Sequence, residues 1–245
     1  MTIFKNQCKA ETIRMLRNPY YIFWSLLMPI IFYIIYTRVF NSGMENQNEW
    51  NAHFLMSMAA FSVMGSSIMT MGIRLVQERS QGWTNYIRVT PLSGLTYFLA
   101  KMIGQSLVHS FSIIVIYAAG MLINDVSLSV SEWVLSAGWI LLASMPFLAL
   151  GTLIGLMNKV ETASGISNIL YLALAITGGM WMPMEMLPDT IQKVGSLLPA
   201  FHFGNGAWQI IGGNSPELKN ILILFGYLVL FMLLSTYIRK KQEAV

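Results

Sequence analysis

Three polar side chains recur at four-residue intervals inside one apolar stretch of this chain, namely Lys101, Gln105 and His109. In a helix, residues four positions apart lie on one face, so these side chains would form a polar stripe. Ionisable groups inside a membrane segment are costly and are often functional. The stripe could face a water-filled pathway or an interface with a second chain. Alternatively, Lys101 extends to the membrane surface and His109 makes one hydrogen bond to a neighbouring helix.

Methionine is abundant, with 18 residues, and five of them lie between positions 56 and 71, including Met64 and Met69. Flexible thioether side chains suit ordinary helix packing, and they also suit a wall that adapts to varied lipophilic ligands. Soft metals such as Cu(I) are a third possible partner of methionine clusters. We place packing first and ligand contact second, and we predict no metal site.

Sequence patterns typical of catalysis are absent. The chain contains no H-E-x-x-H or G-x-S-x-G motif, and no His, Glu or Asp pair with ligand spacing lies in its apolar stretches. It also lacks a G-x-x-x-x-G-K-[ST] phosphate loop, and its single cysteine, Cys8, cannot form an internal disulfide. We therefore predict no catalytic residue and no cofactor in this chain, and an intramembrane enzyme is the least favoured class.

Long apolar stretches must position these residues. Of the 245 residues, 55% are hydrophobic and only 11% are charged, which is too apolar for one soluble core. A membrane-spanning helix needs about 20 mostly apolar residues. Six stretches qualify, at residues 20–40, 54–75, 97–123, 133–156, 163–181 and 220–238. The predicted fold class is therefore an all-α membrane protein with six transmembrane helices in a single domain, residues 1–245.

The distribution of basic residues predicts that both ends of the chain are cytoplasmic. With the N-terminus inside, only Arg38, Lys193 and Lys219 of the 15 basic residues lie on the outer side, which leaves twelve inside. The net charge of +4 is then explained by topology and by contact with anionic membrane lipids, and nucleic-acid binding is not needed.

Residues 1–19 precede the first span, and Ile13, Leu16 and Tyr20 recur there at helical spacing beside basic residues. This pattern predicts a helix that lies along the membrane surface. The alternative is a frayed tail.

The cytoplasmic loop between the second and third spans contains a short amphipathic pattern. Trp83, Tyr86 and Ile87 would share one helical face, and Pro91 disfavours a helix at Thr90. A short helix that ends before the third span is therefore predicted. Its apolar face could rest on lipid headgroups or fill a groove on a cytoplasmic partner.

Residues 182–219 form the largest outer segment and are rich in proline and glycine. Such a segment could form re-entrant helices at the mouth of a pathway. It could instead be an interfacial hairpin whose aromatic residues anchor at the membrane surface.

Two motifs carry a family resemblance. The first follows the pattern E-x-x-x-G-x-x-x-x-x-R-x-T-P-L and continues to a lysine, through Glu78, Gly82, Arg88, Thr90, Pro91, Leu92 and Lys101. The second follows the fifth predicted span, at Gly178, Gly179, Pro183, Leu187, Pro188 and Pro199. In order and spacing these motifs resemble those of ABC-2 type transporter permeases. The length, the spans and the initial surface helix also agree, so the resemblance covers nearly the whole chain.

The resemblance implies the transmembrane subunit of an ATP-binding-cassette exporter in a bacterial cytoplasmic membrane. A separate nucleotide-binding subunit would bind ATP and Mg²⁺, and the first cytoplasmic loop would dock on it as a coupling helix. The implied contact residues are Glu78, Gly82, Trp83, Tyr86, Ile87, Arg88 and Pro91. Trp83, Tyr86 and Ile87 would be buried in the ATPase subunit, whereas Glu78 and Arg88 would fix the register at the rim.

Two further implications concern the outer segment and the assembly. Pro183, Leu187, Pro188 and Pro199 would belong to an extracellular gate. A second permease, identical or related, would complete the transporter, because six helices make half of the usual assembly.

An apolar, methionine-rich interior favours a lipophilic or amphipathic substrate, such as a drug, an antimicrobial peptide or a lipid. The alternative class is a gradient-driven carrier or channel, which should show intramembrane carboxylates, broken helices or inverted repeats. No acidic residue lies well inside any predicted span. An ABC exporter permease is therefore the preferred interpretation.

Overall fold

The computed structural model describes residues 2–17, 19–39, 47–90 and 92–243. All regular structure in these ranges is helical, which confirms the predicted all-α class. The elements, in which η1 is π-helical and η2 is a 3₁₀ turn, are α1 (Thr2–Leu16), α2 (Pro19–Arg38), α3 (Gln47–Gly65), η1 (Ser66–Thr70), α4 (Met71–Ser80), α5 (Trp83–Arg88), α6 (Gly94–Asn124), α7 (Val130–Ala143), α8 (Met145–Ile154), α9 (Val160–Thr177), η2 (Met184–Met186), α10 (Asp189–Gly195), α11 (Pro199–Ile211) and α12 (Leu218–Glu243).

Five helical runs within the described ranges are long and apolar enough to cross a membrane. They are Gln47–Ser80, Thr96–Asn124, Val130–Ile154, Val160–Thr177 and Leu218–Gln242. The first predicted span corresponds to α2, Pro19–Arg38, whose residues Ser25–Arg38 form an apolar helix. Five of the six predicted spans thus overlap helical runs that are long and apolar enough to cross a membrane.

Several observed helix ends differ from the predicted ones. The second run begins at Gln47 instead of Phe54 and ends at Ser80 instead of Leu75. The predicted span at residues 133–156 is two helices, because Pro146 lacks an amide hydrogen and clashes with the preceding turn. The fifth span ends at Thr177 instead of Trp181, where Gly179 adopts a left-handed φ of 74° shortly after the helix end.

Short polar residues fix the starts of two long helices. The Ser93 hydroxyl accepts a hydrogen bond from the amide of Thr96 at 3.1 Å, which caps α6. At the start of α7, Ser129 and Glu132 form a reciprocal capping box. These caps satisfy amide groups that the first helical turns leave without backbone partners.

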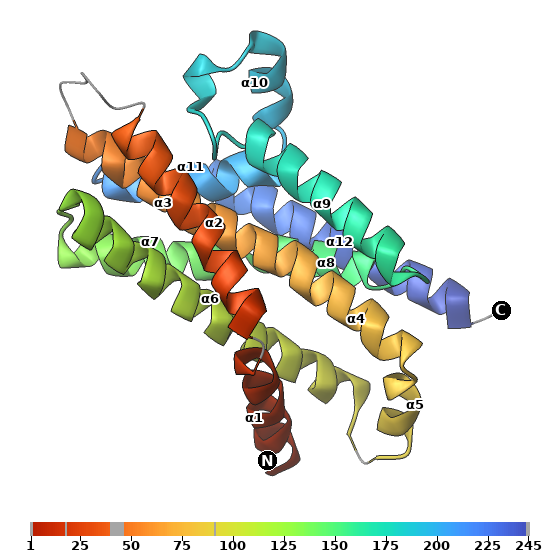
Figure 1. The fold of residues 1–245 in the computed structure, drawn as a ribbon. Coiled ribbons are helices and arrows are strands. Elements are labelled where there is room, and N and C mark those ends of the chain that lie inside the picture. Colours follow the sequence, from red (N-terminus) through yellow and green to blue (C-terminus); the bar gives the residue numbers. More distant parts are fainter. Residues whose placement is uncertain (1, 18, 40–46, 91, 244–245) are drawn as a thin grey trace.

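The continuous run of α3, η1 and α4 is the central rod of the fold. In its most apolar window 94% of the residues are buried, against 6% in α12, which therefore lies at the periphery. The rod contacts α2, α6, α8, α9 and α11 (Figure 1). The sequence places this run among the six predicted spans without distinguishing it as the core.

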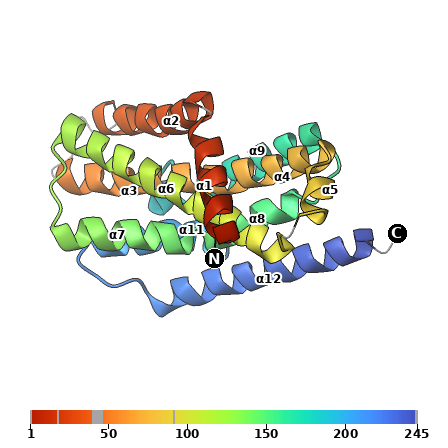
Figure 2. The same cartoon turned by 90° about the horizontal axis from the view of Figure 1, so that it is seen from below.

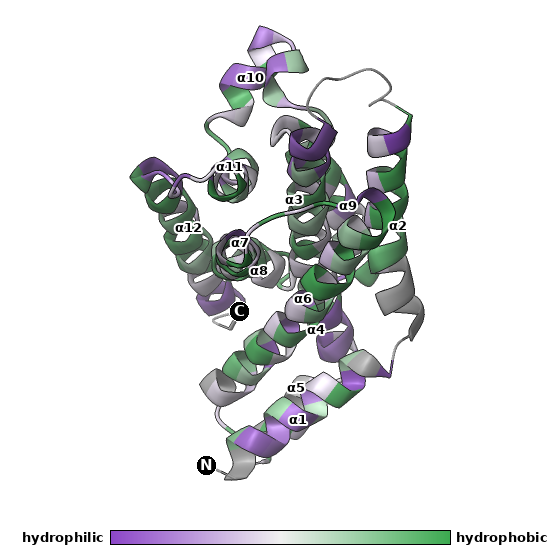
Figure 3. Ribbon diagram, turned by 90° about the vertical axis from the view of Figure 1, so that its left-hand side faces the viewer, coloured by the Kyte–Doolittle hydropathy of each residue, from purple (hydrophilic) through white to green (hydrophobic). Residues whose placement is uncertain are grey.

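Polar elements lie at opposite ends of the molecule. Figure 3 shows α1 at the bottom and α10 at the top, both with many hydrophilic residues, and mostly hydrophobic helices between them. Seen from below, α5 and the end of α12 lie on one side, and the connection from α6 to α7 lies on the other (Figure 2). This arrangement fits a bundle of antiparallel spans.

Candidate functional site

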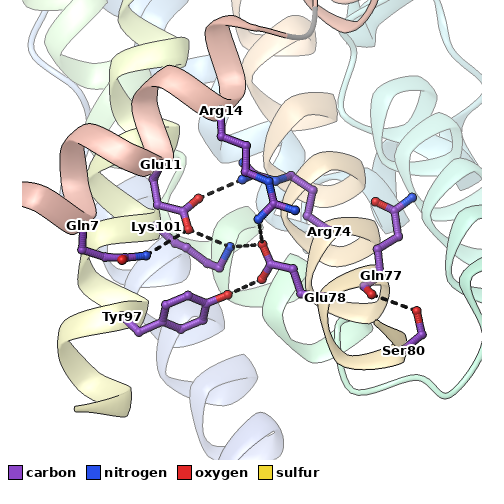
Figure 4. A network of polar contacts seen from close by, with 9 residues as sticks. All are labelled: Gln7, Glu11, Arg14, Arg74, Gln77, Glu78, Ser80, Tyr97 and Lys101. Carbon is purple, nitrogen blue, oxygen red and sulfur yellow. Dashed lines mark hydrogen bonds and ion pairs between the residues drawn. The ribbon is translucent and has the colours of Figure 1, made fainter. Parts of the chain in front are cut away.

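An ion-pair cluster joins α1, α4 and α6 close to the turn that leads into α5 (Figure 4). We call it the ionic cluster; it comprises Glu11, Arg14, Arg74, Glu78, Tyr97 and Lys101. The Lys101 Nζ lies 2.6 Å from Glu78 Oε1 and 3.3 Å from Glu11 Oε1. Lys101 therefore connects a carboxylate of α1 to a carboxylate of α4.

Two arginines complete the cluster from the other side. Arg14 Nη1 lies 2.7 Å from Glu78 Oε1, and Arg74 Nη2 lies 2.8 Å from Glu11 Oε2. The hydroxyl of Tyr97 donates a hydrogen bond to Glu78. Each carboxylate thus has two cationic partners from different helices.

Burial makes these contacts energetically important. Glu11 and Glu78 are each 3% exposed, and Lys101 is 1% exposed. Removing one member of a buried ion pair typically costs about 3–5 kcal/mol, because the other charge is left uncompensated. The ionic cluster therefore holds α1 firmly against α4 and α6.

The positions of Glu78 and Lys101 differ from two expectations. Glu78 was expected at the rim of a partner interface, but its side chain lies inside the ionic cluster. Lys101 does not extend to the surface, since it is enclosed between Glu11 and Glu78. Likewise α1 is a well-formed helix packed against α6, so the frayed-tail alternative is wrong for residues 2–16.

The short helix α5 presents aromatic side chains at the end of the central rod. Trp83 is 44% exposed and Tyr86 is 67% exposed, with ring centroids 6.3 Å apart, whereas Ile87 is half-buried. Gly82 precedes α5 with a φ of 72°, a left-handed conformation that favours glycine. Pro91 and the side chain of Arg88 lie outside the described residues.

The polar stripe faces the central rod. The amide nitrogen of Gln105 donates to Ser66 Oγ at 2.6 Å, and His109 Nε2 lies 3.3 Å from Ser67 Oγ. Both side chains are fully buried. The contact of His109 matches the interpretation in which it makes an interhelical hydrogen bond, and both polar residues pack against the η1 turn.

A cavity of about 740 Å³ lies beside the central rod, between α1, α2, α4 and α9. Met69 contributes to its wall, whereas Met64 is fully buried in the hydrophobic core. One part of the cavity is aromatic, with Phe61 stacked on Tyr171 at 4.6 Å between ring centroids. The cavity size falls within the roughly 300–1,000 Å³ typical of small-molecule sites.

The predicted outer gate residues lie at the boundaries of short elements. Pro183 precedes η2, Leu187 ends it in an extended conformation, and Pro188 precedes α10. Pro199 is in the first turn of α11, where a missing amide hydrogen has no cost.

The helix α11 packs against α3, α7, α9 and α12. The indole nitrogen of Trp208 donates to Ser57 of α3 at 3.0 Å, and that of Trp139 in α7 donates to the carbonyl of Phe203 at 2.9 Å. These contacts hold α11 against α3 and α7.

Sequence reasoning missed Glu11 and gave Arg14 and Arg74 only a topological role. One signal was available, because Glu11 is an acidic residue in an otherwise basic N-terminal segment. Within the described ranges, no three His, Cys, Asp or Glu side chains converge as a metal site would require.

Fold and site together define a helical, multi-pass membrane protein with a cavity beside its central rod and an exposed aromatic helix at one end. A sequence model described as ABC-2 family transporter protein matches residues 38–237, so the chain belongs to this family of ABC transporter permeases. It is also similar to the protein named "Putative transport permease YvfS" of Bacillus subtilis (strain 168), with 60% identity over 245 residues, the full length of both chains. Membership of the family implies a transport subunit that associates with an ABC ATPase subunit.

Proposed function

We propose that this chain is the permease subunit of an ABC exporter in a bacterial cytoplasmic membrane. It moves a lipophilic or amphipathic substrate, such as a drug, an antimicrobial peptide or a lipid, while a separate subunit hydrolyses ATP with Mg²⁺. The observation that carries this proposal is the direct connection of exposed α5 to the central rod that lines the cavity.

The surface of α5 suits a protein partner. Trp83 and Tyr86 are large, exposed aromatic side chains on the six-residue helix α5. Aromatic residues of this kind are enriched at protein interfaces and often dominate their binding energy. In the proposed complex they insert into the ATPase subunit, as a coupling helix does.

The path from α5 to the cavity is short. Only a two-residue turn at Gln81 and Gly82 separates α5 from α4, and α4 contributes Ile73 and Arg74 to the cavity wall. The ionic cluster joins the same part of α4 to α1 and α6. A shift of α5 on ATP binding would therefore move α4 together with both neighbouring helices.

A second permease, identical or related, completes the transporter in this proposal. The helix α2 borders the cavity and carries exposed apolar side chains, including Met28, Ile31 and Ile35. In the assembled transporter these side chains meet the second subunit or membrane lipid, and the cavity becomes part of a central pathway.

The decisive experiment is affinity purification of the tagged protein from its native membrane in mild detergent, followed by mass spectrometry and an ATPase assay. We expect an ABC ATPase to copurify in stoichiometric amounts, and Trp83→Ala to release at least 90% of it. Tyr237→Ala is the control, since Tyr237 of α12 is also an exposed aromatic residue, at 66% against 44% for Trp83. It should retain the ATPase.

A gradient-driven carrier or channel is the alternative. This class requires no ATPase, so purification of the chain alone, with transport that depends on an ion gradient, would favour it. Retention of the ATPase by Trp83→Ala would remove α5 as the coupling element.

A further inference from the structure

The two ends of the cavity differ in chemistry. At one end, Phe32, Phe61 and Trp181 form an aromatic group with ring centroids 5.4–6.3 Å apart. At the other end the wall includes Arg14 and Arg74 of the ionic cluster. Phe61 and Arg74 are thirteen residues apart on the central rod, which corresponds to about 20 Å.

The basic end carries an excess of positive charge. The ionic cluster contains three cations (Arg14, Arg74 and Lys101) and two carboxylates (Glu11 and Glu78), a difference of one positive charge. A guanidinium group has five N–H donors. In the contacts described above, each arginine uses one terminal nitrogen on a carboxylate, and the side chain of Arg14 is 47% exposed.

We propose that the cavity binds an anionic amphiphile, with a carboxylate or phosphate head against Arg14 and Arg74 and an apolar tail along the aromatic end. This inference rests on the proposed function and narrows its substrate class. A cationic head would meet the excess positive charge and is disfavoured. Guanidinium groups match carboxylate and phosphate geometry through paired hydrogen bonds, which supplies the selectivity.

The test compares two probes that share one tail. Purified protein is titrated with dansylamino-undecanoic acid and with its uncharged methyl ester, and binding is followed by dansyl fluorescence. We expect the acid to bind at least tenfold more tightly than the ester. Arg14→Gln should abolish that difference by weakening binding of the acid. Glu78 keeps Lys101 and Tyr97 as partners in this variant, so the fold should persist.

A second variant tests the location. Met28→Trp places a larger side chain in the part of the cavity wall that α2 contributes, and should weaken both probes equally. Equal binding of acid and ester by the unmodified protein would overturn the proposal, and so would binding that neither variant changes. ATP-dependent movement of the acid in vesicles containing the ATPase would identify the ligand as exported cargo. Binding without such movement would identify it as a resident lipid.

Failure of this inference is distinguishable from failure of the proposed function. Probe binding is measured on the purified permease and needs no ATPase, whereas copurification needs no ligand. If an ATPase copurifies but the acid and the ester bind equally well, only the proposal of an anionic ligand head is rejected. The proposed function then stands.

Discussion

Lys101 neutralises two carboxylates that the chain brings from separate helices. Its position inside the membrane-facing bundle is tolerated because Glu11 and Glu78 lie on either side of its ammonium group. Single charges of this kind stabilise a structure only as members of the whole cluster, since each was removed from water at a cost. The contribution of Lys101 to the free energy of unfolding can therefore be measured by replacing it.

Lys101→Met should lower the free energy of unfolding by about 3 kcal/mol, at the lower end of the range for buried pairs, because Arg14 and Arg74 still face the carboxylates. Thermal unfolding in detergent provides the measurement. Lys193→Met, an exposed position on α10, is the control and should change stability by less than about 0.5 kcal/mol. Equal effects of both substitutions would contradict a structural role for the ionic cluster.

At the scale of elements, close approach of backbones determines how the central rod packs. A Cβ atom added to Gly151 of α8 would lie 2.4 Å from the carbonyl oxygen of Ser67 in η1. Only glycine permits this distance, so α8 is held against the widened turn of the rod. By contrast, Gly138 of α7 has open space around its Cα.

Gly151→Ala should therefore destabilise the protein by about 1–3 kcal/mol through forced separation of α8 and η1. Gly138→Ala in the same span is the matched control; it should be neutral or stabilise by about 0.5–1 kcal/mol, as helical alanine does. Both variants can be compared by thermal unfolding. A neutral Gly151→Ala would show that α8 does not pack closely on η1.

Sequence reasoning located the ends of the helices well where the length of an apolar stretch determines them. It located them poorly where contacts with distant residues determine them. The predicted span at residues 97–123 corresponds closely to α6, Gly94–Asn124. The second span was predicted to end at Leu75, where the apolar stretch gives way to charged residues. Their helix continues to Ser80, since Glu78 is neutralised by residues distant in sequence. The η1 turn, five residues long, leaves no periodic signal.

The candidate site was predictable only in part for the same reason. The short aromatic helix at Trp83 follows from local spacing, and its exposure is observed. The partnership of Glu11 with Arg74 joins positions 63 residues apart, which no local pattern indicates. Met64 and Met69 are close in sequence, yet only Met69 reaches the cavity, because their directions depend on how the rod packs.

At the scale of the whole molecule, the distribution of charges predicts which end faces the cytoplasm. The chain has one native cysteine, so single-cysteine variants can report sidedness in a Cys8→Ser background. Gln242→Cys, near the end of α12, should react with a membrane-impermeant maleimide only in inverted vesicles. Asn214→Cys, in the exposed connection before α12, should react only in intact cells or right-side-out vesicles.

Both test positions are exposed in the structure, so differences in labelling report the membrane side and not burial. The opposite labelling pattern would invert the topology and place α5 outside the cell. It would also remove any contact between α5 and a cytoplasmic ATPase.

The ionic cluster also constrains the order in which the molecule is made. Glu11 and Arg14 leave the ribosome early, but Glu78 follows only after the second predicted span and Lys101 only after the third has begun. During that interval α1 lacks the Glu78 and Lys101 side chains and cannot form the ionic cluster. Docking of α1 therefore reports that the first half of the chain has been inserted correctly, and a chain stalled before Lys101 would expose an undocked helix to quality-control proteases.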